Sequence, residues 1–304
     1  MSAGDAGVAA GRRVSVRSVV TWAITLAVLV IVGLVANHHA HEVLETFRKV
    51  SPLPVLAAAA LHAATLALRS EAWRIGLRAL GADALPLTTI HRANGLAFLV
   101  GTVQGELSLP ARVAALRRAD PERAPSAAQT AMVDAPLALV ELACLFAFVA
   151  LWEPPFLIGT VVIAAALPYV ARRVAPARPT GSALRGLMVA SDNAALRRLV
   201  VVMLAVVLIS AARIWLILVA FHLPIDIVSV AKVVAAVTVI GALPFGLGTG
   251  PAATLASLSA GDAAIATDGV AISAGLAISA TSVLGVLAYA ALMWAPAAAA
   301  RLRR

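Results

Sequence analysis

Apolar runs long enough to cross a lipid bilayer follow one another along most of the 304-residue chain. A transmembrane helix needs about 20 predominantly apolar residues. Six runs approach or exceed that length: Ser18–Ala36, Pro52–Leu68, Ala127–Leu151, Phe156–Ala171, Leu199–Phe221 and Val270–Ala300. The pattern predicts an all-α, polytopic integral membrane protein in which these runs form six full crossings.

Two further apolar runs are interrupted by residues that break a helix. Leu85–Val100 is followed by the polar stretch Gly101–Glu106 and by a second apolar stretch that ends at Pro110. Ile227–Leu243 is followed by Pro244–Pro251. Unpaired backbone in hydrocarbon is costly, so broken helices are expected only where protein or water covers them. We therefore expect two re-entrant broken hairpins, one from each face, within a helical bundle of six to eight spans.

The arginines stand between the apolar runs and set the predicted topology. By the positive-inside rule, connections rich in arginine face the cytoplasm. The arginine-rich stretches are residues 69–78, the loop Ala111–Ser126 with Arg112, the segment Arg172–Arg198 and the basic tail 301–304. Trp73 suits the aromatic belt at the membrane interface. We predict a single transmembrane domain over residues 18–300, with cytoplasmic tails over residues 1–17 and 301–304.

Composition excludes a soluble enzyme. The chain is 62% hydrophobic and 13% charged, whereas soluble domains are about 45–50% apolar and about 25% charged. The net charge is +9, and the basic residues that produce it lie between the apolar runs, as the positive-inside rule expects. Nucleic-acid binding is therefore not expected. The chain has one cysteine, Cys144, which allows no intramolecular disulfide and no cysteine-based metal cluster. Gly-x-Ser-x-Gly and His-Glu-x-x-His motifs are absent, and we expect neither enzymatic activity nor a cofactor.

Two acidic residues stand inside a predicted span. Asp134 and Glu141 are seven residues apart in the sequence, which places them on one helix face, two turns apart. An acid near the bilayer centre costs about 2.5–3.5 kcal/mol on insertion scales. Both are therefore expected to face the bundle interior or a hydrated cavity. They relay protons or contact a cationic substrate group, or they form structural ion pairs with buried arginines.

Basic residues and a glycine-rich break are further candidates at membrane depth. Arg213 stands about a dozen residues from both ends of its run, too far to reach the interface. It either binds a lipid phosphate or pairs with Asp134 or Glu141. Lys232 is close enough to an end to snorkel. Gly246–Gly250 lacks the strand and the lysine of nucleotide-binding loops, so it forms a plain turn or a helix start that binds an anion.

Several of these residues form a pattern that resembles a known membrane-protein family. The pattern consists of Arg69-x-x-x-Trp73-Arg74, Asn94, Gly105-Glu106, Asp134 and Pro244-x-Gly246-Leu247-Gly248. It resembles the flippase-like family built on the transmembrane domain of lysylphosphatidylglycerol synthases. An arginine commonly follows Gly-Glu by three residues in that family, whereas this chain has Leu109 there and Arg112 one turn on. The resemblance implies a protein of the bacterial cytoplasmic membrane that moves polar lipids between leaflets.

The residues and the resemblance together predict a lipid translocase for an anionic or isoprenoid-linked polar lipid. The predicted substrate-binding residues are Arg69, Trp73, Arg74, Asn94, Glu106, Asp134, Glu141, Arg213, Gly246 and Gly248. Arg69 and Arg74 would collect a phosphate at the inner face, and Arg213 would receive it midway. Membrane lipids are the expected partners, with a second copy of the chain or a membrane partner protein as further ones.

Three alternatives stay open. A small-solute or ion secondary transporter would use the same broken helices to coordinate a soluble substrate. A membrane enzyme with an isoprenoid-phosphate donor would need an acid near an external loop, where Glu153 and Asp226 stand. A non-catalytic membrane partner subunit would use the charged residues for assembly.

Overall fold

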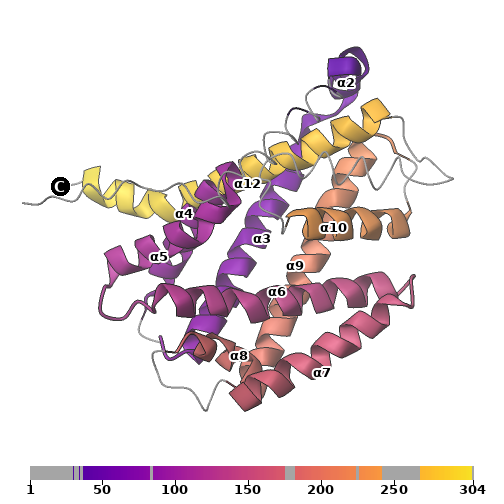
Figure 1. The fold of residues 1–304 in the computed structure, drawn as a ribbon. Helices are drawn as coiled ribbons and strands as arrows, with labels where there is room; N and C mark the ends of the chain where they lie inside the picture. Colours follow the sequence, from indigo (N-terminus) through magenta and orange to yellow (C-terminus); the bar gives the residue numbers. More distant parts are fainter. Residues whose placement is uncertain are drawn as a thin grey trace, which may run out of the picture.

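The computed structural model describes residues 30, 34, 37–82, 85–174, 182–223, 226–241 and 268–302. Every regular element within these ranges is a helix (Figure 1). The elements are α2 (Ala40–Lys49), α3 (Pro52–Ala79), α4 (Leu87–Val103), η1 (Gly105–Leu107), α5 (Ser108–Ala119), α6 (Ala127–Ala150), α7 (Phe156–Val174), η2 (Ala183–Leu187), α8 (Met188–Ser191), α9 (Asn193–Ala220), α10 (Ile227–Gly241) and α12 (Asp268–Leu302).

Five of these helices are long and apolar enough to cross a membrane, namely α3, α6, α7, α9 and α12. The chain is therefore an all-α, multi-pass membrane bundle, as predicted. Apart from residues 30 and 34, the predicted first span Ser18–Ala36 lies outside the described residues. The predicted break at Gly246–Gly250 also lies outside them.

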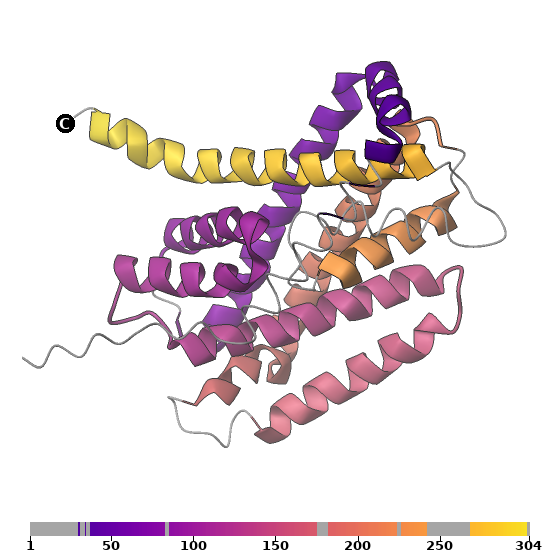
Figure 2. The same cartoon turned by 45° about the horizontal axis from the view of Figure 1, so that its top comes forward.

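An antiparallel pair of long helices, α3 and α9, forms the centre of the bundle (Figure 1). The contact between them is the most extensive in the described structure, and both contribute fully buried side chains such as Leu77 and Ile217. Helix α6 packs on α9, and α12 lies across α3 (Figure 2). Helix α7 packs on α6 and exposes Ile158, Val161 and Val162, which suits contact with lipid chains that are as apolar as these side chains.

Side-chain caps fix where three of the long helices begin. Ser51 accepts a hydrogen bond from the backbone of the first turn of α3, which starts with Pro52. Ser126 and Gln129 form a capping box at the start of α6, and Asp192 accepts two backbone hydrogen bonds at the start of α9. Each cap satisfies N–H donors that a helix terminus leaves without an internal partner.

A helix break occurs where the sequence predicts the first hairpin. Helices α4 and α5 hold 17 and 12 residues, each shorter than the roughly 20 residues that cross a bilayer. They pack on each other, and Gln104 between them is extended, with φ −148° and ψ 110°. Gly101 lies so close to α5 that a Cβ atom would stand 3.2 Å from Ser108 Cβ. The two helices form a short, tightly packed hairpin.

The predicted loop Ala111–Ser126 is wrong in its first half. Residues up to Ala119 continue helix α5, and Arg112 is only 8% exposed. The positive-inside rule assigns arginines near a span to the cytoplasm because a lone buried charge is costly. Arg112 escapes that cost because it has a carboxylate partner inside the bundle.

The described part of the arginine-rich segment Arg172–Arg198 consists mainly of helices. Its two ends belong to α7 and α9, and the short elements η2 and α8 pack against α6 and against neighbouring helices. Val189 and Ala190 of α8 are fully buried, and Gly186 of η2 contacts the α6 backbone at Met132. These short elements close one end of the bundle.

The variant Gly186→Ala tests this close approach. Its Cβ would lie 2.6 Å from the Met132 carbonyl carbon, and overpacking of this kind costs about 1–3 kcal/mol. We expect a lower Tm in detergent. The control Gly95→Ala meets its nearest atoms at 3.8 Å and should leave Tm unchanged or raise it. Equal Tm values for the two variants would contradict the packing described here.

Candidate functional site

Five of the ten predicted site residues line one cavity of about 220 Å³ between the helices. This central cavity is lined by the polar residues Arg69, Trp73, Asn94, Arg112, Asp134 and Glu141, together with apolar side chains that include Phe98 and Met203. The lining comes from α3, α4, α5, α6 and α9. The short hairpin α4–α5 therefore completes a cavity whose other walls are long helices.

Two ion pairs cross the central cavity. Arg112 Nη1 on α5 donates to both carboxylate oxygens of Asp134 on α6, at 2.8 and 2.9 Å. Arg69 Nη2 on α3 donates to Glu141 Oε1 on the same face of α6. Asp134 and Glu141 therefore share one face of α6, as predicted. Each forms an ion pair with an arginine, which was one of the two alternatives for these acids. Pairing lowers the cost of placing four charges among apolar helices.

Trp73 lies buried in the bundle interior, whereas a residue of an aromatic belt faces lipid and water. Its ring is 2% exposed, and the Arg112 guanidinium carbon lies 4.8 Å from the ring centroid. A cation over an indole face is attracted to it, more strongly where water is excluded. Trp73 and Asp134 thus hold Arg112 between them.

Several buried polar atoms around the central cavity have no hydrogen-bond partner among the described residues. They are both amide atoms of Asn94, the Nε atom of Arg112 and the indole Nε1 of Trp73. Asn94 is 1% exposed, and Trp73 Nε1 lies near the Asp134 carboxylate without reaching hydrogen-bond geometry. Each buried unpaired polar group costs about 1–3 kcal/mol. Each of these atoms exposes less than 1 Å², so a polar guest in the cavity would pair with them after a shift of the neighbouring side chains.

Arg213 occupies a separate polar cluster. Its Nη2 atom donates to the Ile278 carbonyl at 2.5 Å and to the hydroxyls of Thr281 and Ser282 on α12. Its Nη1 atom lies 2.7 Å from His62 Nδ1 on α3, and that nitrogen must accept because a guanidinium only donates. Arg213 therefore fastens α9 to α3 and α12.

The predicted pairing of Arg213 with Asp134 or Glu141 is wrong. The central cavity contacts α9 at Met203, and Arg213 stands about 15 Å further along the helix at 1.5 Å per residue. Its buried charge is compensated instead by a carbonyl and hydroxyls. Arg213 also does not line the cavity, so it does not share a site with the two acids.

Arg74 lies on the opposite side of α3 from Arg69. The two residues are five positions apart, which is about 140° around a helix at 3.6 residues per turn. Arg74 Nε donates to Glu71 Oε2 at 2.6 Å, and both residues line a larger cleft of about 870 Å³. We call this the arginine cleft, lined by Glu71, Arg74, Arg78, Asp192, Arg197 and Arg198 among others.

Three predicted site residues are not placed relative to the central cavity. Glu106 belongs to η1, the turn between α4 and α5. Gly246 and Gly248 lie outside the described residues. Arg112 was not predicted as a site residue. The available signal was that the family resemblance places an arginine where this chain has Leu109, and Arg112 follows one helical turn later. A buried arginine with a partner looks the same in sequence as a cytoplasmic one.

Both acids at the turns that were predicted to be external, Glu153 and Asp226, have interaction partners. Asp226 Oδ1 accepts a hydrogen bond of 2.8 Å from Ser229 N–H, and hydrogen bonds from Ser229 hold the pKa of Asp226 below its usual value. Glu153 Oε1, in the turn between α6 and α7, lies 3.7 Å from Lys232 Nζ. A carboxyl group that stays ionised is a poor general acid.

Within the described ranges, no group of three histidine, cysteine or acidic residues has an arrangement that could hold a metal ion. Comparison with protein-family models, curated proteins and solved structures finds no match to this chain. The site is therefore interpreted from its own geometry.

The Arg112–Asp134 pair can be tested by a double-mutant cycle. Asp134→Asn strands the Arg112 charge, whose side chain is 10% exposed, and Arg112→Gln strands the Asp134 carboxylate, which is 42% exposed. Breaking a fully buried pair costs about 3–5 kcal/mol, and screening of the exposed carboxylate makes the loss smaller here. The double variant removes both charges and should be less destabilised than the sum of the single variants. Unfolding in detergent measures all four proteins. Additive losses would contradict the pairing.

A second cycle uses Arg69→Gln and Glu141→Gln. In each pair one side chain is buried and the other is partly exposed: 10% for Arg112 and 42% for Asp134, against 13% for Glu141 and 40% for Arg69. Water screens the exposed partner of both pairs to a similar degree, so similar coupling energies are expected.

Proposed function

We propose that this protein is a lipid translocase of the bacterial cytoplasmic membrane, which passes the headgroup of an anionic lipid through the central cavity. The observation that supports this proposal is that residues with unpaired polar atoms, Asn94, Arg112 and Trp73, line one cavity beside two ion pairs, between the hairpin α4–α5 and the long helices α3 and α6. A charged headgroup that leaves water needs polar groups of the protein as replacement partners, because moving an unpaired charge out of water costs a large free energy. The acyl chains can stay in lipid throughout.

The size of the central cavity supports a headgroup as its guest. Sites for drug-sized ligands are about 300–1,000 Å³, and this cavity is about 220 Å³. It has room for a compact polar group and not for a whole lipid. The proposal therefore places only the phosphate and its nearest atoms inside.

The donors around the central cavity favour a guest rich in acceptor oxygens. Indole and guanidinium nitrogens only donate, and the Asn94 amide offers donors and one acceptor. The four charged side chains cancel formally, so the preference comes from these free donors and from Arg69, whose exposed fraction leaves it able to exchange Glu141 for a phosphate. Arginine binds phosphate through two parallel hydrogen bonds.

Orientation is part of the same proposal. Arg78 ends α3 and Arg197 and Arg198 begin α9, at the same end of the antiparallel pair. The positive-inside rule assigns that end to the cytoplasm, with the chain termini on the same side. The resemblance to the flippase-like family of lysylphosphatidylglycerol synthases agrees with this orientation and with lipid as the substrate.

Leaflet exchange in proteoliposomes tests the proposal. Fluorescent phosphatidylglycerol, phosphatidylcholine and an isoprenoid phosphate are each reconstituted with folded protein, and quenching of the outer leaflet follows their exchange. Wild-type protein should accelerate exchange of the anionic lipids. Asn94→Leu keeps the branched shape and the number of heavy atoms but removes the unpaired amide, and we expect about a tenfold slower exchange, as for a lost hydrogen bond to a charged group.

Val161→Leu is the matched control, because Val161 is an exposed residue of α7 outside the central cavity. It should exchange lipid at the wild-type rate. Absence of accelerated exchange for all three lipids with folded wild-type protein would contradict a translocase. Uptake of a soluble anion in the same vesicles would support the secondary-transporter alternative.

A further inference from the structure

The arginine cleft carries more positive charge than its own acids neutralise. It has four arginines and two acids among its lining residues. Both acids are occupied: Glu71 binds Arg74 through both carboxylate oxygens, and Asp192 accepts from the N–H groups of Ala194 and Ala195. The lining residues of the cleft therefore have a formal net charge of +2.

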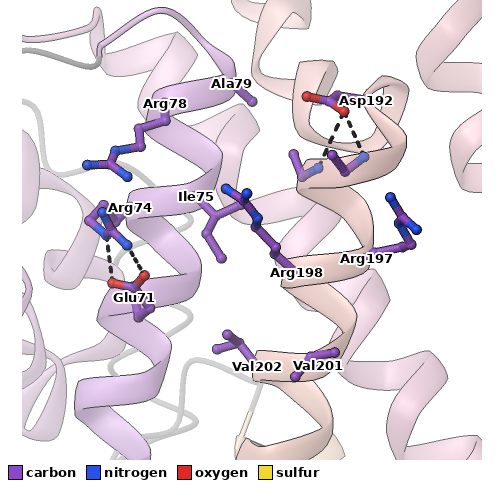
Figure 3. A pocket seen from close by; sticks show the side chains of 12 residues that line it. Glu71, Arg74, Ile75, Arg78, Ala79, Asp192, Arg197, Arg198, Val201 and Val202 are labelled. Carbon is purple, nitrogen blue, oxygen red and sulfur yellow. Dashed lines mark hydrogen bonds and ion pairs between the residues drawn. The ribbon is translucent and has the colours of Figure 1, made fainter.

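Three arginines of the cleft have no ion pair within the described part of the chain. They are Arg78 at the end of α3 and Arg197 and Arg198 in the second turn of α9. Figure 3 places Arg198 between the two helices, pointing toward Ile75 on α3, while Arg197 extends from another side of α9. Unlike arginines scattered along a helix end, these come from two helices and border one cleft.

The cleft also has an apolar wall. Ile75 on α3 and Val201 and Val202 on α9 line it beside the arginines. Val201 is well exposed and stands about one turn further into the bundle than Arg197. A ligand that fills this space meets guanidinium groups near the helix ends and apolar side chains toward the middle of the helices.

We propose that the arginine cleft is a binding site for the phosphate group of an anionic membrane lipid, separate from the central cavity. Arginine recognises phosphate by paired hydrogen bonds, and basic pockets between helices at the cytoplasmic face bind anionic headgroups. The apolar wall gives the first acyl carbons a place beside the headgroup, which a free phosphate would not use. The two sites share no lining residue and occupy opposite sides of α3.

The site is independent of translocation. The cleft would hold its lipid whether or not the central cavity passes one across the membrane. Binding and leaflet exchange are therefore measured separately, and either can fail without the other.

Native mass spectrometry of the full chain in detergent tests the inference, with phosphatidylglycerol and phosphatidylcholine as probes. The triple variant Arg78→Gln, Arg197→Gln and Arg198→Gln should bind phosphatidylglycerol about tenfold more weakly, since each basic residue contributes to anionic-lipid binding. The matched control replaces the exposed arginines Arg117, Arg118 and Arg123 with Gln. It removes the same charge elsewhere and should bind as the wild type does.

Retention of the charge provides a second check on folding. The variant with lysine at positions 78, 197 and 198 should keep a preference for phosphatidylglycerol over phosphatidylcholine, and its Tm should match that of the glutamine variant. Unchanged binding in the glutamine triple variant would overturn the inference, and so would an equal loss in the control. Displacement of the lipid by inorganic phosphate at equal concentration would assign the cleft to free phosphate instead.

Discussion

The pairing of two α6 carboxylates with arginines from neighbouring helices is the interaction on which the described bundle depends. Asp134 holds Arg112 of α5, and Glu141 holds Arg69 of α3. Without these partners, the buried charges of Arg112 and Glu141 would remain in a low-dielectric interior at a cost of several kcal/mol. With them, the short hairpin α4–α5 is tied to the long helices, and the space between becomes a polar cavity. The same charges that threaten stability therefore define the candidate site.

Helix α3 separates two polar regions that differ in what they can bind. On one side, Arg69 and Trp73 face the small central cavity, where the charges cancel and the unpaired atoms are mostly donors. On the other side, Arg74 and Arg78 face the wider arginine cleft, where positive charge is in excess. Arg213 belongs to neither, because its hydrogen bonds to α12 and its contact with His62 serve the packing of three helices.

Much of the fold could be predicted from hydropathy, because a bilayer imposes length and polarity directly. The spans, the break before α5 and the common face of Asp134 and Glu141 all follow from spacing alone. The partner of each charge does not, since pairing depends on which helix lies opposite. Arg112 looked cytoplasmic for that reason. Arg69 and Arg74 looked like one patch because they are close in sequence, although the helix turns them to different sides.

Translocation as proposed requires a lipid phosphate to enter the central cavity and to meet its unpaired donors. Solid-state NMR measures this most directly, through dipolar coupling between ³¹P of phosphatidylglycerol and the ¹⁵N-labelled side-chain amide of Asn94 in membranes. Coupling consistent with a hydrogen bond, absent in Asn94→Leu and retained in Val161→Leu, is the predicted result. Absence of coupling in the wild-type protein, under conditions where it accelerates exchange of the same lipid, would contradict the claim.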